Sequence, residues 1–150
     1  MKKLQFIIIS MLVVLMFSSC ATTYQYVSFP DRNKNLEDTA LARIYVMRPA
    51  FMATAISMKV AENDTLIGST GPKGFLCWET APSDKTLEST SENTSRLELK
   101  VEKGKVYFVH QHVLMGILYA RNSLELVTDE QKAQKLLKKC KKPVIKTGKK

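Results

Sequence analysis

The chain has 150 residues, a formal net charge of +9 and a hydrophobic fraction of 45%, values that suit a single globular domain of ordinary size. Most of the basic charge lies at the C-terminus, because residues 21–131 carry twelve basic and fourteen acidic side chains, whereas residues 132–150 carry nine lysines and no acid. A body with a net charge of −2 excludes a globally basic surface of the kind that binds nucleic acid.

Residues 1–19 have the order of a secretion signal. Two lysines follow Met1, an apolar run of 14 residues extends from Leu4 to Phe17, and two serines lead into Cys20. This run is shorter than the ~20 residues that a transmembrane helix needs, so a signal peptide that is removed is favoured over a retained span.

The segment Phe17-Ser18-Ser19-Cys20 resembles the lipobox of bacterial lipoproteins, although that family usually has leucine at the position of Phe17. The resemblance implies that Cys20 receives a diacylglyceryl group and becomes the mature N-terminus. Residue 21 is alanine rather than aspartate, which under the sorting rules of that family implies the cell outer membrane, on its periplasmic face. The alternative is an ordinary signal peptide followed by an incidental cysteine.

Residues 20–41 have no sustained hydrophobic period and mix polar residues with Pro30, so we expect a lipidated tether. Tyr24, Tyr26 and Phe29 interrupt this polar stretch. They are expected either to pack on the domain or to lie at the level of the lipid headgroups.

Short runs rich in β-branched and aromatic residues, separated by turn residues, fill the next part of the chain. Asn63-Asp64 is a tight-turn sequence between two such runs, and Leu97, Leu99 and Val101 alternate toward one face. The pattern predicts a mainly β fold, an antiparallel β-sandwich of about 7–8 short strands. The expected strands are residues 42–48, 55–61, 65–69, 74–80, 85–90, 96–102, 105–115 and 122–127.

One amphipathic helix is predicted near residues 129–139, where it closes the domain of residues 42–140. Thr128 and Gln131 have the spacing of a capping box. An apolar stripe follows at helical spacing, formed by Ala133, Leu136, Leu137 and Cys140. The predicted core consists of Ile44, Val46, Trp78, Leu97, Leu99, Val101, Phe108 and Leu136, whereas Arg48 is expected at the rim of the sheet.

Residues 141–150 form a lysine-rich tail, which is expected to be mobile because Pro143 and Gly148 disfavour a continued helix. Lysines held beside a membrane can bind anionic headgroups weakly, and the alternative is a solubilising end. The lysines assigned to anionic-surface binding are Lys138, Lys139, Lys141, Lys142, Lys146, Lys149 and Lys150.

The predicted domain contains five short motifs: ARIYVMRP from Ala42, Ile67-Gly68, Gly74-Phe75, Pro82, and the run from Gly104 to Phe108. In these motifs the chain, from Ala42 to about Cys140, resembles an uncharacterised family of small bacterial lipoproteins. That family often has Pro-Gly where this chain has Pro82-Ser83. The resemblance implies a compact β-sandwich related to the PEGA type with no established reaction, so no catalytic residue is carried over.

His110 and His112 are the candidate metal ligands of this sequence. Residues i and i+2 of a strand project to the same face, so the two imidazoles can hold one metal ion. Zinc needs at least one further protein ligand, which Cys77 or Glu79 could supply. The alternative is a pair of ordinary histidines on a half-exposed strand.

Cys77 and Cys140 remain after lipidation of Cys20, and an oxidising compartment permits a disulfide between them. The alternative is a buried Cys77 beside a free thiol near the tail.

Together these features predict a non-enzymatic binding or structural module of the cell envelope. Its expected partners are the membrane, through the anchor, and an envelope protein, glycan or lipid; no cofactor and no nucleic acid are expected. The alternative is a metal-binding protein or metalloenzyme that uses His110 and His112.

Overall fold

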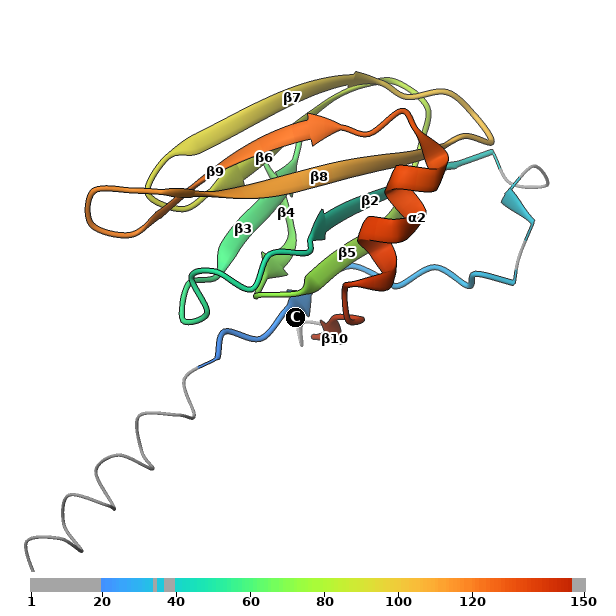
Figure 1. The fold of residues 1–150 in the computed structure, drawn as a ribbon. Coiled ribbons are helices and arrows are strands. Elements are labelled where there is room, and N and C mark those ends of the chain that lie inside the picture. Colours follow the sequence, from blue (N-terminus) through green and yellow to red (C-terminus); the bar gives the residue numbers. More distant parts are fainter. Residues whose placement is uncertain (1–19, 34, 37–39, 147–150) are drawn as a thin grey trace, which may run out of the picture.

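The computed structural model describes residues 20–33, 35–36 and 40–146, which fold into two facing sheets and one short helix (Figure 1). This arrangement confirms the predicted mainly β sandwich with a C-terminal helix. The elements are β1 (Tyr24–Gln25), β2 (Ala42–Arg48), β3 (Met58–Glu62), β4 (Thr65–Thr70), β5 (Gly74–Thr80), β6 (Asp84–Thr90), β7 (Thr94–Lys100), β8 (Val106–Met115), β9 (Ala120–Leu126), α2 (Glu130–Lys138) and β10 (Val144–Ile145).

The larger sheet has the strand order β10-β1-β4-β3-β6-β7, and the smaller sheet has the order β5-β2-β8-β9. The expectation of a wholly antiparallel sandwich is wrong for two pairs, because β2 runs parallel to β8 and β1 runs parallel to β10. After β2 in the smaller sheet, β3 and β4 lie in the larger sheet, β5 in the smaller sheet, and β6 and β7 in the larger sheet. Strand β8 then lies beside β2 in the smaller sheet and runs in the same direction.

The eight expected strands correspond to β2 through β9, with differences at their ends. The strand expected at residues 55–61 begins at Met58, because residues 49–57 form a loop. The strand expected at residues 96–102 is two residues early, at Thr94–Lys100. The two-residue strands β1 and β10 were not expected, since so short a segment has no hydrophobic pattern of its own.

The tight turn between β3 and β4 lies where the sequence predicts it. Asn63 and Asp64 have φ angles of 45° and 65°, so both central residues are in the left-handed region. This is the requirement of a two-residue type I′ hairpin, and asparagine and aspartate tolerate it better than most residues.

The main core lies between the sheets and contains five of the predicted core residues in buried positions: Ile44, Val46, Trp78, Leu99 and Val101. Leu97 is partly buried against this core. Phe108 and Leu136 instead pack on a second cluster, which lies on the outer face of the smaller sheet under α2 and is built on Tyr45, Met47, Phe75, Cys77 and Leu137. Strand β2 is buried along its whole length, because it contributes to both clusters.

Helix α2 covers the second cluster with the predicted stripe, in which Ala133 and Leu137 are buried. The predicted capping box is wrong by one position. Asp129 is the N-cap, and its carboxylate accepts a hydrogen bond from the Lys132 amide at 3.1 Å. Both Thr128 and Asp129 are residue types that suit an N-cap, and the structure uses Asp129.

Part of the expected tether lies on the domain. Strand β1 pairs with β4 on one side and β10 on the other, and the Gln25 side chain bonds both backbone groups of Cys77, at 2.9 and 2.7 Å. Phe29 packs edge-on against Phe75 with 6.1 Å between ring centroids, which confirms that this aromatic packs on the domain. A chain with these buried contacts is not a free linker over residues 21–29.

The first half of the lysine-rich tail is also docked, contrary to the expected mobile end. Strand β10 extends the larger sheet, and Nζ of Lys146 lies 3.6 Å from the centroid of the Tyr24 ring. Main-chain pairing with β1 holds this segment, and such pairing leaves no signature in side-chain composition. Lys149 and Lys150 lie outside the described residues.

Arg48 is fully buried, so its expected place at the sheet rim is wrong. Its guanidinium donates four hydrogen bonds to backbone carbonyls, to Ile56 at 2.6 Å, Thr70 at 3.0 Å, Met52 at 3.0 Å and Ala53 at 2.9 Å. Burial lowers the pKa of Arg48 to about 10. Arg48 therefore organises the β2–β3 loop from inside the sandwich.

Candidate functional site

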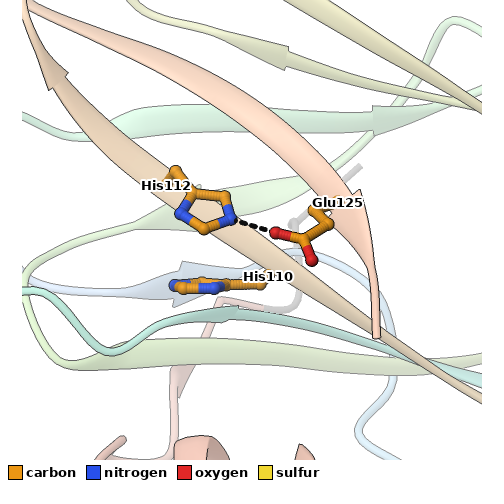
Figure 2. A group of neighbouring side chains, drawn as sticks. All are labelled: His110, His112 and Glu125. Atoms are coloured by element: carbon orange, nitrogen blue, oxygen red, sulfur yellow. Dashed lines mark hydrogen bonds and ion pairs between the residues drawn. The ribbon is translucent and has the colours of Figure 1, made fainter. Parts of the chain in front are cut away.

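The two predicted histidines lie side by side on the outer face of the smaller sheet (Figure 2). His110 and His112 are two residues apart in β8, and their ring centroids are 3.7 Å apart. Strand β9 runs antiparallel to β8 and places Glu125 directly opposite His110. The pairing of β8 with β9 thus brings three potential ligands together.

Glu125 is engaged with its neighbours. Its carboxylate lies 2.6 Å from Nε2 of His112 and 3.5 Å from Nζ of Lys132 on α2. The hydrogen bond with His112, followed by the charge of Lys132, lowers the pKa of Glu125. The carboxylate is therefore ionised at neutral pH and has one strong and one long contact.

His110 is half-buried and is held neutral. Burial lowers its pKa to about 4, and the charges of His112 and Lys132 act in the same direction against the opposing effect of Glu125. Its Nδ1 atom is buried and finds no hydrogen-bond partner among the described residues. A neutral imidazole is the form that binds metals.

The donor atoms of His110, His112 and Glu125 all lie within 4.8 Å of one another. Two imidazoles and one carboxylate are the donor set of several open zinc sites, in which three protein ligands leave a fourth position for water. The same geometry is also satisfied by a surface ion pair beside a half-buried histidine, and the nearby Lys132 ammonium opposes a divalent cation.

The third ligand that the sequence suggested is wrong. Cys77 and Glu79 both lie on β5, which is separated from β8 by β2. Cys77 pairs with Tyr45, while Glu79 forms an ion pair with Arg43 at 2.7 Å. Glu125 was missed because its position beside His110 depends on the β8–β9 register, although the expected strand at residues 122–127 contains it.

Cys77 and Cys140 are free thiols, so the structure shows no disulfide in the part of the chain that it describes. Both contact the second cluster, Cys77 buried and Cys140 half-buried. Burial raises the pKa of each thiol to about 12. This arrangement is that of the alternative, a buried Cys77 beside a free thiol near the tail.

Cys20 is exposed at the point where the described chain begins. It lines a cavity of about 280 Å³ together with Phe51 and three lysines: Lys73, Lys141 and Lys142. No carboxylate is among the described residues that line this cavity. Two of the lysines assigned to anionic-surface binding, Lys141 and Lys142, are thus placed beside the expected lipidation site.

No helix among the described residues combines the length and the apolar composition that crossing a membrane requires.

Two comparisons with known proteins extend these observations. Residues 38–122 match a family described as "Protein of unknown function (DUF2846)", a match that includes His110 and His112 and ends before Glu125. The chain is also similar to an "Uncharacterized protein" of Haemophilus influenzae, with 27% identity over 124 residues that span 79% of this chain and 73% of the relative.

Proposed function

This chain belongs to the DUF2846 family of proteins of unknown function, and we propose that it is a lipid-anchored, non-enzymatic binding or structural module of the cell envelope. In this proposal the acyl chains on Cys20 hold the domain at the periplasmic face of the outer membrane. The partner is an envelope protein, glycan or lipid.

The surroundings of Cys20 carry the proposal. This cysteine directly follows a sequence with the order of a lipoprotein signal, and it is exposed beside Lys73, Lys141 and Lys142. An acyl chain at Cys20 would bring anionic headgroups against these lysines, and each contributes at most ~1 kcal/mol near such a surface. Two or three acyl chains make the attachment effectively permanent.

The buried polar groups support a structural rather than catalytic use. Glu62 accepts hydrogen bonds from Trp78 Nε1 at 2.5 Å and from Thr80 at 2.6 Å, and it pairs with Lys85 at 2.9 Å. Gln111 likewise bonds two neighbouring hydroxyls inside the sandwich. Groups that are committed to internal partners stabilise the fold and are not free for proton transfer.

The test is acyl incorporation in intact bacteria, measured by labelling with a fatty-acid analogue and by the mass of the N-terminal peptide. The wild-type chain should carry the label on Cys20, and Cys20→Ser should carry none. Cys140→Ser is the matched control and should be labelled like the wild type. Absence of label from the wild type, or equal label on Cys20→Ser, would show that the anchor is wrong.

The proximity of Glu125 to both histidines favours a second candidate function, metal binding at His110, His112 and Glu125. Zinc titration of the metal-stripped protein, followed by calorimetry, tests it. One ion should bind, and Glu125→Gln should weaken binding about 10-fold or more. Ser123→Ala, opposite His112 in the same sheet, is the control and should leave binding unchanged. Zinc affinity that does not change in Glu125→Gln would contradict this metal site, and the three side chains would then be a surface ion pair beside a half-buried histidine.

A further inference from the structure

We infer that the end of the sandwich that carries Cys20 is a membrane-contact surface, in which the β8–β9 hairpin tip enters the headgroup–acyl boundary of the bilayer. The inference rests on the proposed lipid anchor and adds the orientation of the domain. The hairpin tip is defined here as residues 115–119.

The hairpin tip is the most exposed apolar segment of the described chain. Ile117 is 89% exposed and Leu118 is 81% exposed, and Met115 and Tyr119 are exposed beside them. Single exposed apolar residues are ordinary, but four within five positions at a projecting tip are typical of a surface that contacts another apolar phase. In Figure 1 this tip projects from the left-hand end of the sandwich.

The amides of the tip have a hydrogen-bond partner inside the protein. The Glu92 carboxylate accepts hydrogen bonds from the amides of Ile117 at 3.0 Å, Leu118 at 3.2 Å and Tyr119 at 2.8 Å. These bonds, led by the one from Tyr119, lower the pKa of Glu92. Backbone groups that enter lipid must be satisfied inside the protein, and the bonds to Glu92 meet this need for three successive amides.

Gly116 makes that contact possible. A Cβ atom at this position would lie 2.1 Å from the Glu92 carboxylate and 2.0 Å from the Tyr119 carbonyl oxygen. Both distances are well below van der Waals contact, so any larger residue would displace the carboxylate. Gly116 therefore leaves room for the Glu92 carboxylate, and the hydrogen bonds to that carboxylate hold the backbone of the apolar tip.

The hairpin tip shares its end of the molecule with the anchor. The amide of Ala21 donates to the Thr54 carbonyl at 2.7 Å, which fastens the residue after Cys20 to the β2–β3 loop. The same loop exposes Phe51 and Met52, and its last residues line a cleft together with Glu92 and Tyr119. In Figure 1 the hairpin projects at the left, the described chain starts below the sheets, and the β2–β3 loop lies between the two.

The charges at this end fit a bilayer. Lys73, Lys141 and Lys142 surround Cys20, and Nζ of Lys73 lies 5.3 Å from the centroid of the Phe51 ring. Lysines can extend their ammonium groups to phosphate while apolar neighbours enter the membrane below them. Because residue 21 is bonded to the domain, an acylated Cys20 cannot hold the bilayer at a distance from this surface.

The experiment uses the full chain, purified from membranes and reconstituted into vesicles of phosphatidylethanolamine and phosphatidylglycerol. Leu118→Trp reports the tip, and Leu66→Trp is the control. Leu66 is exposed near the Asn63–Asp64 turn, at the other end of β3 from the β2–β3 loop. The native Trp78 is only 2% exposed and gives a constant background. Fluorescence is recorded with and without brominated acyl chains.

Brominated lipid should quench most of the emission added by Leu118→Trp and leave that of Leu66→Trp unchanged. Adding Glu92→Gln to the Leu118→Trp chain should reduce this quenching, because the single oxygen of glutamine cannot accept all three hydrogen bonds from the amides of the tip. Equal response of the two tryptophans, or no quenching in protein that floats with the vesicles, would overturn the contact surface while the anchor stands. Emission shielded from aqueous acrylamide but insensitive to brominated lipid would assign the tip to a contact with a second copy of the chain and would overturn the membrane contact. Failure to float would overturn the anchor and the surface with it.

Discussion

Replacing Arg48 tests how the sandwich holds the β2–β3 loop. The guanidinium bonds four carbonyls, of which only that of Thr70 is bonded at a fully buried position. In Arg48→Met the buried Thr70 carbonyl loses its partner at a cost of ~1–3 kcal/mol, and the three half-buried bonds cost ~0.5–1.5 kcal/mol each. Relief of the buried charge offsets part of this sum. We expect a loss of about 3 kcal/mol in the free energy of unfolding.

Urea denaturation followed by Trp78 fluorescence measures this loss. Arg96→Met is the matched control, because Arg96 is 69% exposed and its pair with Glu88 lies on the surface. An exposed pair contributes ~0–1 kcal/mol, so the control should be nearly as stable as the wild type. Arg48→Lys should not restore stability, since one ammonium cannot reach four carbonyls arranged around a planar fork.

Amide hydrogen exchange separates a local effect from a global one. Exchange in residues 49–57 should accelerate more than exchange in β8, because three of the four carbonyls belong to that loop. A change below ~0.5 kcal/mol, the range of ordinary surface substitutions, would refute the structural role of Arg48.

Three further predictions concern the core, the candidate site and the thiols. Leu99→Ala should cost ~2–5 kcal/mol in denaturant unfolding, because the side chain is buried between the sheets, and a change below ~0.5 kcal/mol would contradict that burial. The pKa of His110 is lowered from 6.5 to about 4, so the unfolded chain binds the proton at a higher pH than the folded chain does. The free energy of unfolding should therefore fall as pH decreases from about 6.5 toward 4. Denaturant unfolding at pH 7 and pH 5 measures this fall, and His110→Gln should reduce it. In the Cys20→Ser chain, which lacks the exposed thiol, Cys77 and Cys140 should react with a thiol reagent at pH 8 only after denaturation, because their pKa values are raised to about 12. Fast reaction of that folded chain would disprove their burial.

The candidate site shows where sequence reasoning succeeds and where it stops. His110 and His112 were assigned to one face because the period of a strand is two, and this holds for any regular strand. Glu125 was not assigned, since its place opposite His110 depends on the register of two strands whose pairing no local pattern specifies. The same reason explains the incorrect choice of Cys77 and Glu79.

The sequence by itself determined the mainly β class, the eight central strands, the Asn63-Asp64 turn, the closing helix and most of the core. Each of these depends on hydrophobic period, turn chemistry or capping within a few neighbouring residues. Only the tertiary structure decided that Arg48 is buried, that β1 and β10 dock the expected tether and tail, and that Glu92 holds the hairpin tip. All three rest on bonds to backbone groups. Every residue offers the same backbone groups, so the pattern of side chains does not predict these bonds.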